Sequence, residues 1–157
     1  MQLLSEVGFY DDLYAELEGA REVTVCTFQY DHPELHARLL RGLRGGLSLL
    51  LCVDKQGVST CRGMRSRLLD LKRAGADVRA CQGHGHQGVY GAGGAGLTGH
   101  MHKKVVVIDR RVGYLGGQNL TRSSLTNEEN TFKEKGPVVA ELLASALDTS
   151  TRGEAFS

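Results

Sequence analysis

A histidine and a lysine two residues apart are the pair in this sequence best suited to chemistry. His102 and Lys104 open an apolar run that ends at Asp109, and Gly116-Gly117-Gln118-Asn119 follows shortly after. Side chains two residues apart on a strand share one face, so a strand over 101–109 places an imidazole beside an ammonium group. Such a pair suits an anionic substrate, because the lysine neutralises phosphate charge while the histidine attacks phosphorus or transfers a proton.

The residues after this run are suited to binding phosphate. Gly116 and Gly117 have no side chains, so their backbone N–H groups can approach a phosphate oxygen closely. Asn119 adds an amide donor. H-x-K alone indicates only a surface strand, but the full pattern H-x-K-x4-D-x6-G-G-x-N arises by chance on the order of once in 10⁷–10⁸ positions. The pattern therefore predicts a phosphate-binding site.

This pattern resembles the signature of the phospholipase D superfamily. The segment Asn127-Glu128-Glu129-Asn130 is similar to the N-x-E-N element of its small single-motif members, which include small bacterial endonucleases. Met101-His102-Lys103-Lys104 resembles the motif opening of the mitochondrial cardiolipin hydrolase (Zucchini-type) group. The resemblance extends over residues 10–147 and implies phosphodiester hydrolysis through a phosphohistidine.

The resemblance also implies a role for each residue. His102 is the nucleophile, and Lys104, Asn119 and Gly117 bind phosphate oxygens. Glu129 is expected to accept a hydrogen bond from the imidazole. Asp109 is counted with the catalytic group, although its opposite strand parity to His102 predicts a supporting role.

The family builds each active site from two copies of the motif, and this chain has one. An isologous homodimer is therefore implied, with one His102 from each copy. No metal or other cofactor is implied, because the lysines supply the positive charge. Many members have Gly-Ser where this chain has Gly116-Gly117, so one hydroxyl contact is missing.

Three functions remain open at this point. The first is an endonuclease acting on single-stranded nucleic acid, and the second is a phospholipid hydrolase acting on cardiolipin. The motif fits both, but the absence of tryptophan and of any apolar stretch long enough to span a membrane weighs against the lipid. The third is a catalytically silent protein that binds phosphate-bearing partners.

Alternating apolar strands and amphipathic helices predict a mixed α/β fold, with a largely parallel central sheet flanked by helices. The whole chain, 1–157, is predicted to be one domain. Predicted strands are 22–30, 47–53, 77–81, 101–109, 112–116 and 129–133. Predicted helices are 10–20, 33 to the glycines at 45 (with Asp31 as N-cap), 63–74 and 138–147, while 54–60 is predicted to be a loop.

Two segments fall outside this alternation. Eight of the seventeen residues from Gly83 to Gly99 are glycine, which predicts either a flexible surface insertion or a mobile loop that leads into the catalytic strand and shapes substrate access. The polar tail, 150–157, is predicted to be disordered.

The net charge of +1 requires any basic surface to be local. One basic cluster is expected to be a solvated helix face, and the other surrounds the motif: Arg62, Arg65, Arg67, Lys72 and Arg73 form the first, and Lys103, Lys104, Arg110 and Arg111 the second. His32 and His36 are expected at the surface. His100 either lies in a loop or assists at the site, and His84 and His86 belong to the glycine-rich segment, from which they could touch phosphate.

The four cysteines form no C-x-x-C pair, so a reducing, cytosolic location is predicted. The mitochondrial surface is the alternative, if an anchor is missing from this chain. The spacing matches no standard zinc pattern, although Cys61, Cys81, His84 and His86 could approach one another. Because of the mismatched spacing, no metal is expected at these residues.

Overall fold

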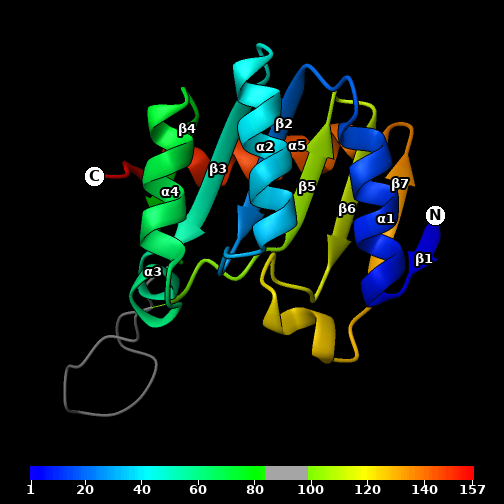
Figure 1. The fold of residues 1–157 in the computed structure, drawn as a ribbon. Helices are drawn as coiled ribbons and strands as arrows, with labels where there is room; N and C mark the ends of the chain where they lie inside the picture. Colours follow the sequence, from blue (N-terminus) through cyan, green and yellow to red (C-terminus); the bar gives the residue numbers. More distant parts are fainter. Residues whose placement is uncertain (84–98) are drawn as a thin grey trace.

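The computed structural model describes residues 1–83 and 99–157, and within them the chain builds one mixed sheet flanked by helices (Figure 1). The strand order is β1-β7-β6-β5-β2-β3-β4-β8. The strands are β1 Gln2–Leu4, β2 Glu22–Thr27, β3 Ser48–Asp54, β4 Asp77–Cys81, β5 Val105–Ile108, β6 Val112–Gly116, β7 Thr131–Lys135 and β8 Glu154–Ala155. The helices are α1 Glu6–Leu17, α2 Pro33–Arg44, α3 Lys55–Thr60, α4 Met64–Arg73 and α5 Val138–Thr151, with a 3-10 turn, η1, at Ser123–Thr126.

The mixed α/β class is confirmed, but the sheet has fewer parallel strands than expected. Only β2, β3 and β4 are parallel neighbours, joined by the crossovers that contain α2 and α4. The other described pairings, on both sides of these three strands, are antiparallel. For β5 and β6 the reason is connection length: three residues, 109–111, join them, and so short a link can form only a hairpin.

The two faces of the sheet are covered unequally. Helices α1, α2 and α4 lie side by side on one face, whereas α5 alone crosses the other (Figure 1). The larger apolar core lies under the three helices and includes the fully buried Leu51, Met64 and Ile108. Beneath α5, Val105 and Val107 of β5 pack against Val139 and Leu143. Part of the α5 face is left exposed, with consequences described below.

Several boundaries differ from the sequence-based predictions. The predicted loop 54–60 contains α3, because the Asp54 carboxylate caps its first turn by accepting hydrogen bonds from the backbone N–H groups of Gln56 and Gly57. The tail predicted to be disordered is ordered: α5 continues to Thr151, and β8 then pairs with β4. Burial of Phe156 and the hydrogen bond from its backbone N–H to the Val78 carbonyl hold it there.

His32 and His36 were predicted at the surface and are buried, with exposed fractions of 7% and 6%. His32, rather than Asp31, is the N-cap of α2 and packs against the Tyr10 ring at 4.3 Å. The His36 ring is 2.9 Å from the Tyr30 hydroxyl. Both histidines were expected to be exposed because charged residues adjoin them in the sequence. Aromatic side chains of α1 and of the segment after β2 cover them instead.

We expect the free energy of unfolding to fall as the pH drops below about 6.5, the ordinary histidine pKa. Desolvation lowers the pKa of both His32 and His36, so the unfolded chain binds protons more readily than the folded one. The contribution of the two neutral histidines to the free energy of unfolding is present above the unfolded-state pKa. It is lost as the pH falls toward the lower pKa values of the folded state. Urea unfolding at about pH 8 and about pH 5.5 should show the loss. His32→Asn, which keeps a capping side chain, should reduce it, and equal midpoints at both pH values would contradict the prediction.

None of the helices within residues 1–83 and 99–157 is long and apolar enough to cross a membrane.

Candidate active site

The carboxyl ends of several strands meet at one end of the sheet, the lower end in Figure 1, where most of the motif residues lie. Strands β2, β3, β4 and β6 end there, and β5 begins there. Phe28 follows β2, Asp54 ends β3, His102 precedes β5 and Asn119 follows β6. Side chains at strand ends of an open α/β sheet are the usual place for ligand binding. Residues from four different chain segments therefore meet at one site.

His102 and Lys104 lie together, but not because they share a strand. β5 begins only at Val105, and the backbone N–H of Met101 bonds to the Asp54 carboxylate instead of to a neighbouring strand. Lys104 folds back over His102: its Nζ is 2.5 Å from Nδ1, 3.2 Å from Nε2 and 2.9 Å from the His102 carbonyl oxygen. The predicted pairing is present, produced by an irregular segment.

The electrostatics of this pair favour a neutral imidazole. Desolvation and the adjacent Lys104 ammonium both lower the pKa of His102. Desolvation also lowers the pKa of Lys104, and the nearby Glu129 carboxylate opposes that shift. Because an imidazole must be neutral to attack phosphorus or to accept a proton, the lowered pKa favours His102 as a nucleophile or a base.

Asn119 is held with its amide group oriented. The backbone N–H of Gln29 lies 3.4 Å from Oδ1, and the Asn119 carbonyl accepts a 2.6 Å hydrogen bond from the Ser124 hydroxyl. With Oδ1 facing Gln29, the Nδ2 group is the donor left for a substrate oxygen. The neighbouring Gln118 is 3% exposed and has no hydrogen-bond partner for its amide among the described residues.

Glu129 lies over Gly117. A Cβ atom at Gly117 would come within 2.5 Å of Glu129 Oε2, so the missing side chain makes room for this carboxylate. The backbone N–H of Glu129 bonds to Glu6 at the start of α1 at 2.8 Å. The expected bond to the His102 imidazole is not among the contacts of the described residues. The carboxylate instead acts electrostatically on Lys104.

Asp109, which the signature counts with the catalytic group, lies at the opposite end of β5. It is five residues from Lys104, which corresponds to about 16 Å along a strand. Its Oδ1 accepts hydrogen bonds from the backbone N–H groups of Arg21 and Glu22 at 2.8 and 2.9 Å. Asp109 thus joins the start of β2 to the β5–β6 turn, where its own φ is +51°. Its role here is structural.

We expect Asp109→Ala to lower the free energy of unfolding by about 1–3 kcal/mol, through two lost hydrogen bonds and a strained backbone. The kcat of any phosphodiester hydrolysis should stay within about threefold, because the side chain is remote from His102. Asp109→Asn should be milder, since asparagine keeps the acceptor and tolerates positive φ. Urea unfolding and steady-state kinetics on the same preparations test both; a large loss of kcat in a stably folded variant would contradict this assignment.

Sequence reasoning missed two residues that touch the site. The Phe28 ring lies 5.0 Å from the His102 ring, and the Lys104 Nζ is 6.0 Å from its centroid. Asp54 is 1% exposed and bonds to the backbone next to His102. Their positions in the sequence could have identified them, because each lies at the carboxyl end of an apolar strand that reaches this end of the sheet.

The two predicted basic clusters do not form one phosphate-binding surface. Lys103 bonds to Ser145 and Thr149 of α5, while Arg110 and Arg111 pair with Glu22 and Glu16 at the far end of β5. In the α4 cluster, Arg65 and Lys72 bond to the carbonyl oxygens of Ser157 and Phe156. Lys104 alone of the second cluster therefore faces the site.

The described residues contain no group of three or more histidine, cysteine or acidic side chains arranged to hold a metal. Cys61 packs beside the main core and contacts Asp31, whereas Cys81 belongs to the cluster under α5 with Cys26 and Cys52. These two candidate zinc ligands therefore lie apart. His84 and His86, like most of the glycine-rich segment, lie outside the described residues. The predicted cytosolic location remains a prediction.

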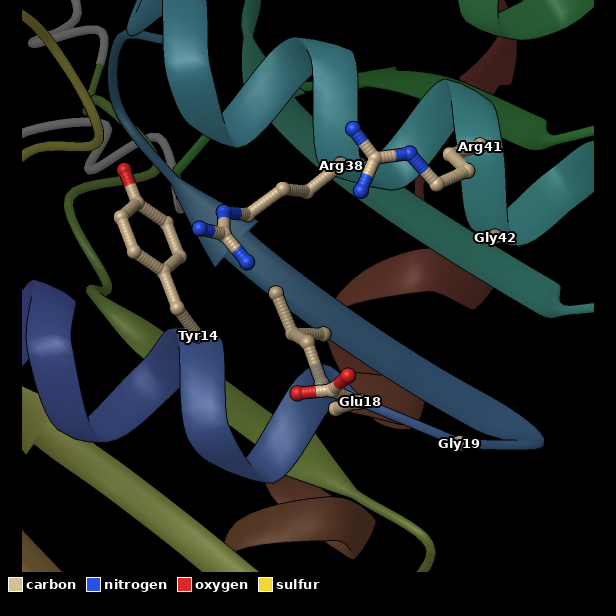
Figure 2. Close-up of a pocket in the computed structure, with 7 residues that line it drawn as sticks. Tyr14, Glu18, Gly19, Arg38, Arg41 and Gly42 are labelled. Atoms are coloured by element: carbon tan, nitrogen blue, oxygen red, sulfur yellow. The ribbon is translucent and has the colours of Figure 1, made fainter.

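A cleft of about 180 Å³ between α1 and α2 is separate from this site (Figure 2). Within it, the Arg38 guanidinium lies 4.2 Å from the Tyr14 ring centroid. The cleft lies at the carboxyl end of α1. Glu6, at the amino end of α1, bonds to the backbone N–H of Glu129 at the motif site. A twelve-residue helix is about 18 Å long, so the cleft is not part of the motif site.

The fold and the site define a class of protein, an α/β domain with a single H-x-K-x4-D motif at one end of its sheet. The sequence matches the family described as cardiolipin synthase, PLD-like domain, over residues 13–149. The chain therefore belongs to the phospholipase D superfamily. No curated protein sequence matches.

Solved structures agree on the fold. NucT from Helicobacter pylori is similar with a TM-score of 0.85 and 17% identity, covering 99% of this chain and 98% of that one. Nuc from Salmonella typhimurium, a phospholipase D family member, has a TM-score of 0.78 and 16% identity, covering 99% and 96%. Phosphatidylserine synthase of Haemophilus influenzae has a TM-score of 0.63 and 16% identity, covering 97% of this chain and 38% of that one. At these identities the likeness concerns the fold.

Proposed function

We propose that this protein is a metal-independent phosphodiesterase that acts through a phosphohistidine, and that its substrate is single-stranded nucleic acid. The observation that carries the proposal is the contact between His102 and the Lys104 ammonium, at 2.5 and 3.2 Å from the two ring nitrogens. A neutral imidazole beside a fixed positive charge can attack a phosphate that the same charge binds.

In the first step, a His102 ring nitrogen attacks phosphorus, and the bond from phosphorus to the leaving oxygen breaks. That oxygen takes a proton from the partner's His102. Lys104 and Asn119 Nδ2 hold the non-bridging oxygens, whose negative charge increases during attack. Backbone N–H groups near Gly116 and Gly117 can add to this binding, since no side chains block their approach.

In the second step, water attacks the phosphohistidine and the phosphorus–nitrogen bond breaks. The partner's His102, now neutral, takes the proton from water, which restores both imidazoles to their starting states. The cycle needs one neutral and one protonated imidazole. The two rings then titrate as a coupled pair, and the rate should depend on pH with a maximum between their apparent pKa values.

A homodimer supplies the second imidazole, and the uncovered sheet face supports one. On the α5 side, Leu3, Phe132, Leu115 and Val105 lie in register across β1, β7, β6 and β5. Helix α5 covers Val105, but Leu3 and Leu115 are 57% and 43% exposed. This apolar row leads directly to the site, because Leu115 precedes Gly116 and Val105 follows Lys104. A second copy packed here would bury it and bring its own His102 close.

We expect mixing to reveal a shared site. If wild-type and His102→Asn chains are co-refolded in equal amounts, only the doubly wild-type pairs, about one quarter, should be active. Independent sites would retain about one half of the wild-type activity at the same total chain concentration. Leu115→Glu should yield a folded, inactive monomer by sedimentation. Val7→Glu, at another exposed apolar position, on α1, is the control that should remain dimeric.

Two features support nucleic acid as the substrate. The partly buried Phe28 ring beside His102 offers an aromatic surface on which a base can stack. The sequence also resembles the small single-motif members of the family, which include endonucleases. The test is cleavage of labelled single-stranded DNA and RNA in excess EDTA, with His102→Asn as the negative control. No cleavage of either strand type by a confirmed dimer would contradict the substrate assignment.

The second candidate function is hydrolysis of a phospholipid. Its specific support is that Val7 and Leu125, on α1 and η1 near Glu129, are exposed to 61% and 38% and could contact a bilayer surface. Cardiolipin liposomes are therefore the second substrate in the same assay. Release of phosphatidic acid by wild-type protein, without nucleic-acid cleavage, would favour this function.

A further inference from the structure

Asp54 is a buried carboxylate next to the proposed nucleophile. It is 1% exposed, and its oxygens accept hydrogen bonds from the backbone N–H groups of Gln56, Gly57 and Met101 at 2.8, 3.1 and 2.6 Å. One carboxylate thus ties the start of α3 to the segment that carries His102. A buried negative charge is costly unless a positive charge lies nearby.

His100 provides that positive charge when it is protonated. Its Nδ1 is 3.6 Å from Asp54 Oδ1, the one ion-pair contact of Asp54 within the described part of the chain. The His100 side chain is 46% exposed, so the ring contacts a buried carboxylate while remaining accessible to solvent. A histidine oriented through one ring nitrogen by a carboxylate keeps the other nitrogen available for a ligand.

Phe28 contacts both His100 and His102. The Phe28 ring lies 5.9 Å from the His100 ring, nearly perpendicular at 76°, and 5.0 Å from the His102 ring. The Lys104 Nζ is 6.0 Å from the same ring centroid, so both imidazoles and the ammonium group lie close to one phenyl ring. His100 therefore faces the region that a bound phosphodiester would occupy, rather than the protein core.

We propose that His100 is a second phosphate-binding imidazole of the site and that Asp54 is the residue that positions it. His100 Nε2–H donates to a phosphate oxygen of the bound substrate, beside the oxygens held by Lys104 and Asn119. Asp54 acts through His100 and through the Met101 backbone, and does not touch the substrate. The inference deepens the proposed function and rests on its phosphodiester substrate.

The test compares His100→Gln, Asp54→Asn and the control Asp77→Asn, an exposed carboxylate that pairs with Arg79. Hydrolysis of bis(4-nitrophenyl) phosphate by the full chain gives KM and kcat separately. Loss of one charge-assisted hydrogen bond in the bound state should raise KM about tenfold in His100→Gln, with kcat within about threefold. Asp54→Asn should raise KM similarly and also lower the melting temperature, whereas Asp77→Asn should leave KM unchanged.

A binding measurement separates this inference from the proposed function. Titration of the same probe into the His102→Asn variant, followed by the NMR signal of the His100 ring, requires no turnover. A saturable shift of that signal supports the inference even if wild type hydrolyses nothing, in which case only the proposed function fails. An unchanged KM in folded His100→Gln, or no shift on titration, would show that His100 merely balances the charge of Asp54 and would overturn the inference.

Discussion

The variant His102→Asn should lose phosphodiester hydrolysis almost completely, with kcat lowered by about 10⁴-fold or more. The side chain has two roles in the proposed cycle, nucleophile in one copy and proton donor in the other, and asparagine can perform neither. The effect should be confined to kcat, because Lys104 and Asn119 remain to bind phosphate. Steady-state kinetics in EDTA, with matched unfolding curves, measure this loss.

The covalent intermediate provides a second readout for the same residue. Rapid quenching of wild-type protein with a phosphorus-labelled substrate should trap label on the protein, in the acid-labile, base-stable form typical of phosphohistidine. His102→Asn should trap none. Activity within tenfold of wild type in a folded variant would exclude His102 as the nucleophile. Wild-type protein that binds the substrate but neither turns it over nor becomes labelled would favour the silent phosphate-binding alternative.

The variant Lys104→Met should lower kcat by about 10²–10³-fold. The ammonium group stabilises negative charge that increases on phosphate during attack, and methionine keeps most of the volume but none of the charge. Lys103→Met is the matched control one residue away. The Lys103 Nζ bonds to Ser145 and Thr149 of α5, so its loss should reduce stability and leave kcat nearly unchanged.

The pH dependence distinguishes this role from simple loss of binding. Lys104 helps to lower the pKa of His102, so its removal should raise that pKa toward the ordinary histidine value. A higher pKa means that the imidazole becomes neutral only at higher pH. The acidic limb of the kcat/KM profile of Lys104→Met should therefore move to higher pH, while that of Lys103→Met should not. Coincident limbs in both variants would contradict the assignment.

The sequence by itself predicted the family, the mixed α/β class and the candidate residues His102, Lys104, Asn119 and Glu129. These are local or strongly patterned features. His102 and Lys104 are two residues apart, so their backbones stay close whether or not the segment is a strand, and the pairing survives although β5 begins later than predicted. The αβ alternation before residue 82 similarly set the parallel core of β2, β3 and β4.

Other features depend on which segments the sheet brings together, and no local pattern encodes that. Asp54 and Phe28 lie far from His102 in the sequence. They reach it because β2 lies between β5 and β3 in the sheet, so the ends of the three strands are close together. Asp109 belongs to the motif but lies at the wrong end of β5, since a strand separates its ends by about 3.3 Å per residue. His32 and His36 are buried by aromatic rings of other segments, and the C-terminal tail is ordered by pairing with β4. Burial and long-range pairing are properties of the assembled fold, so only the tertiary structure decided them.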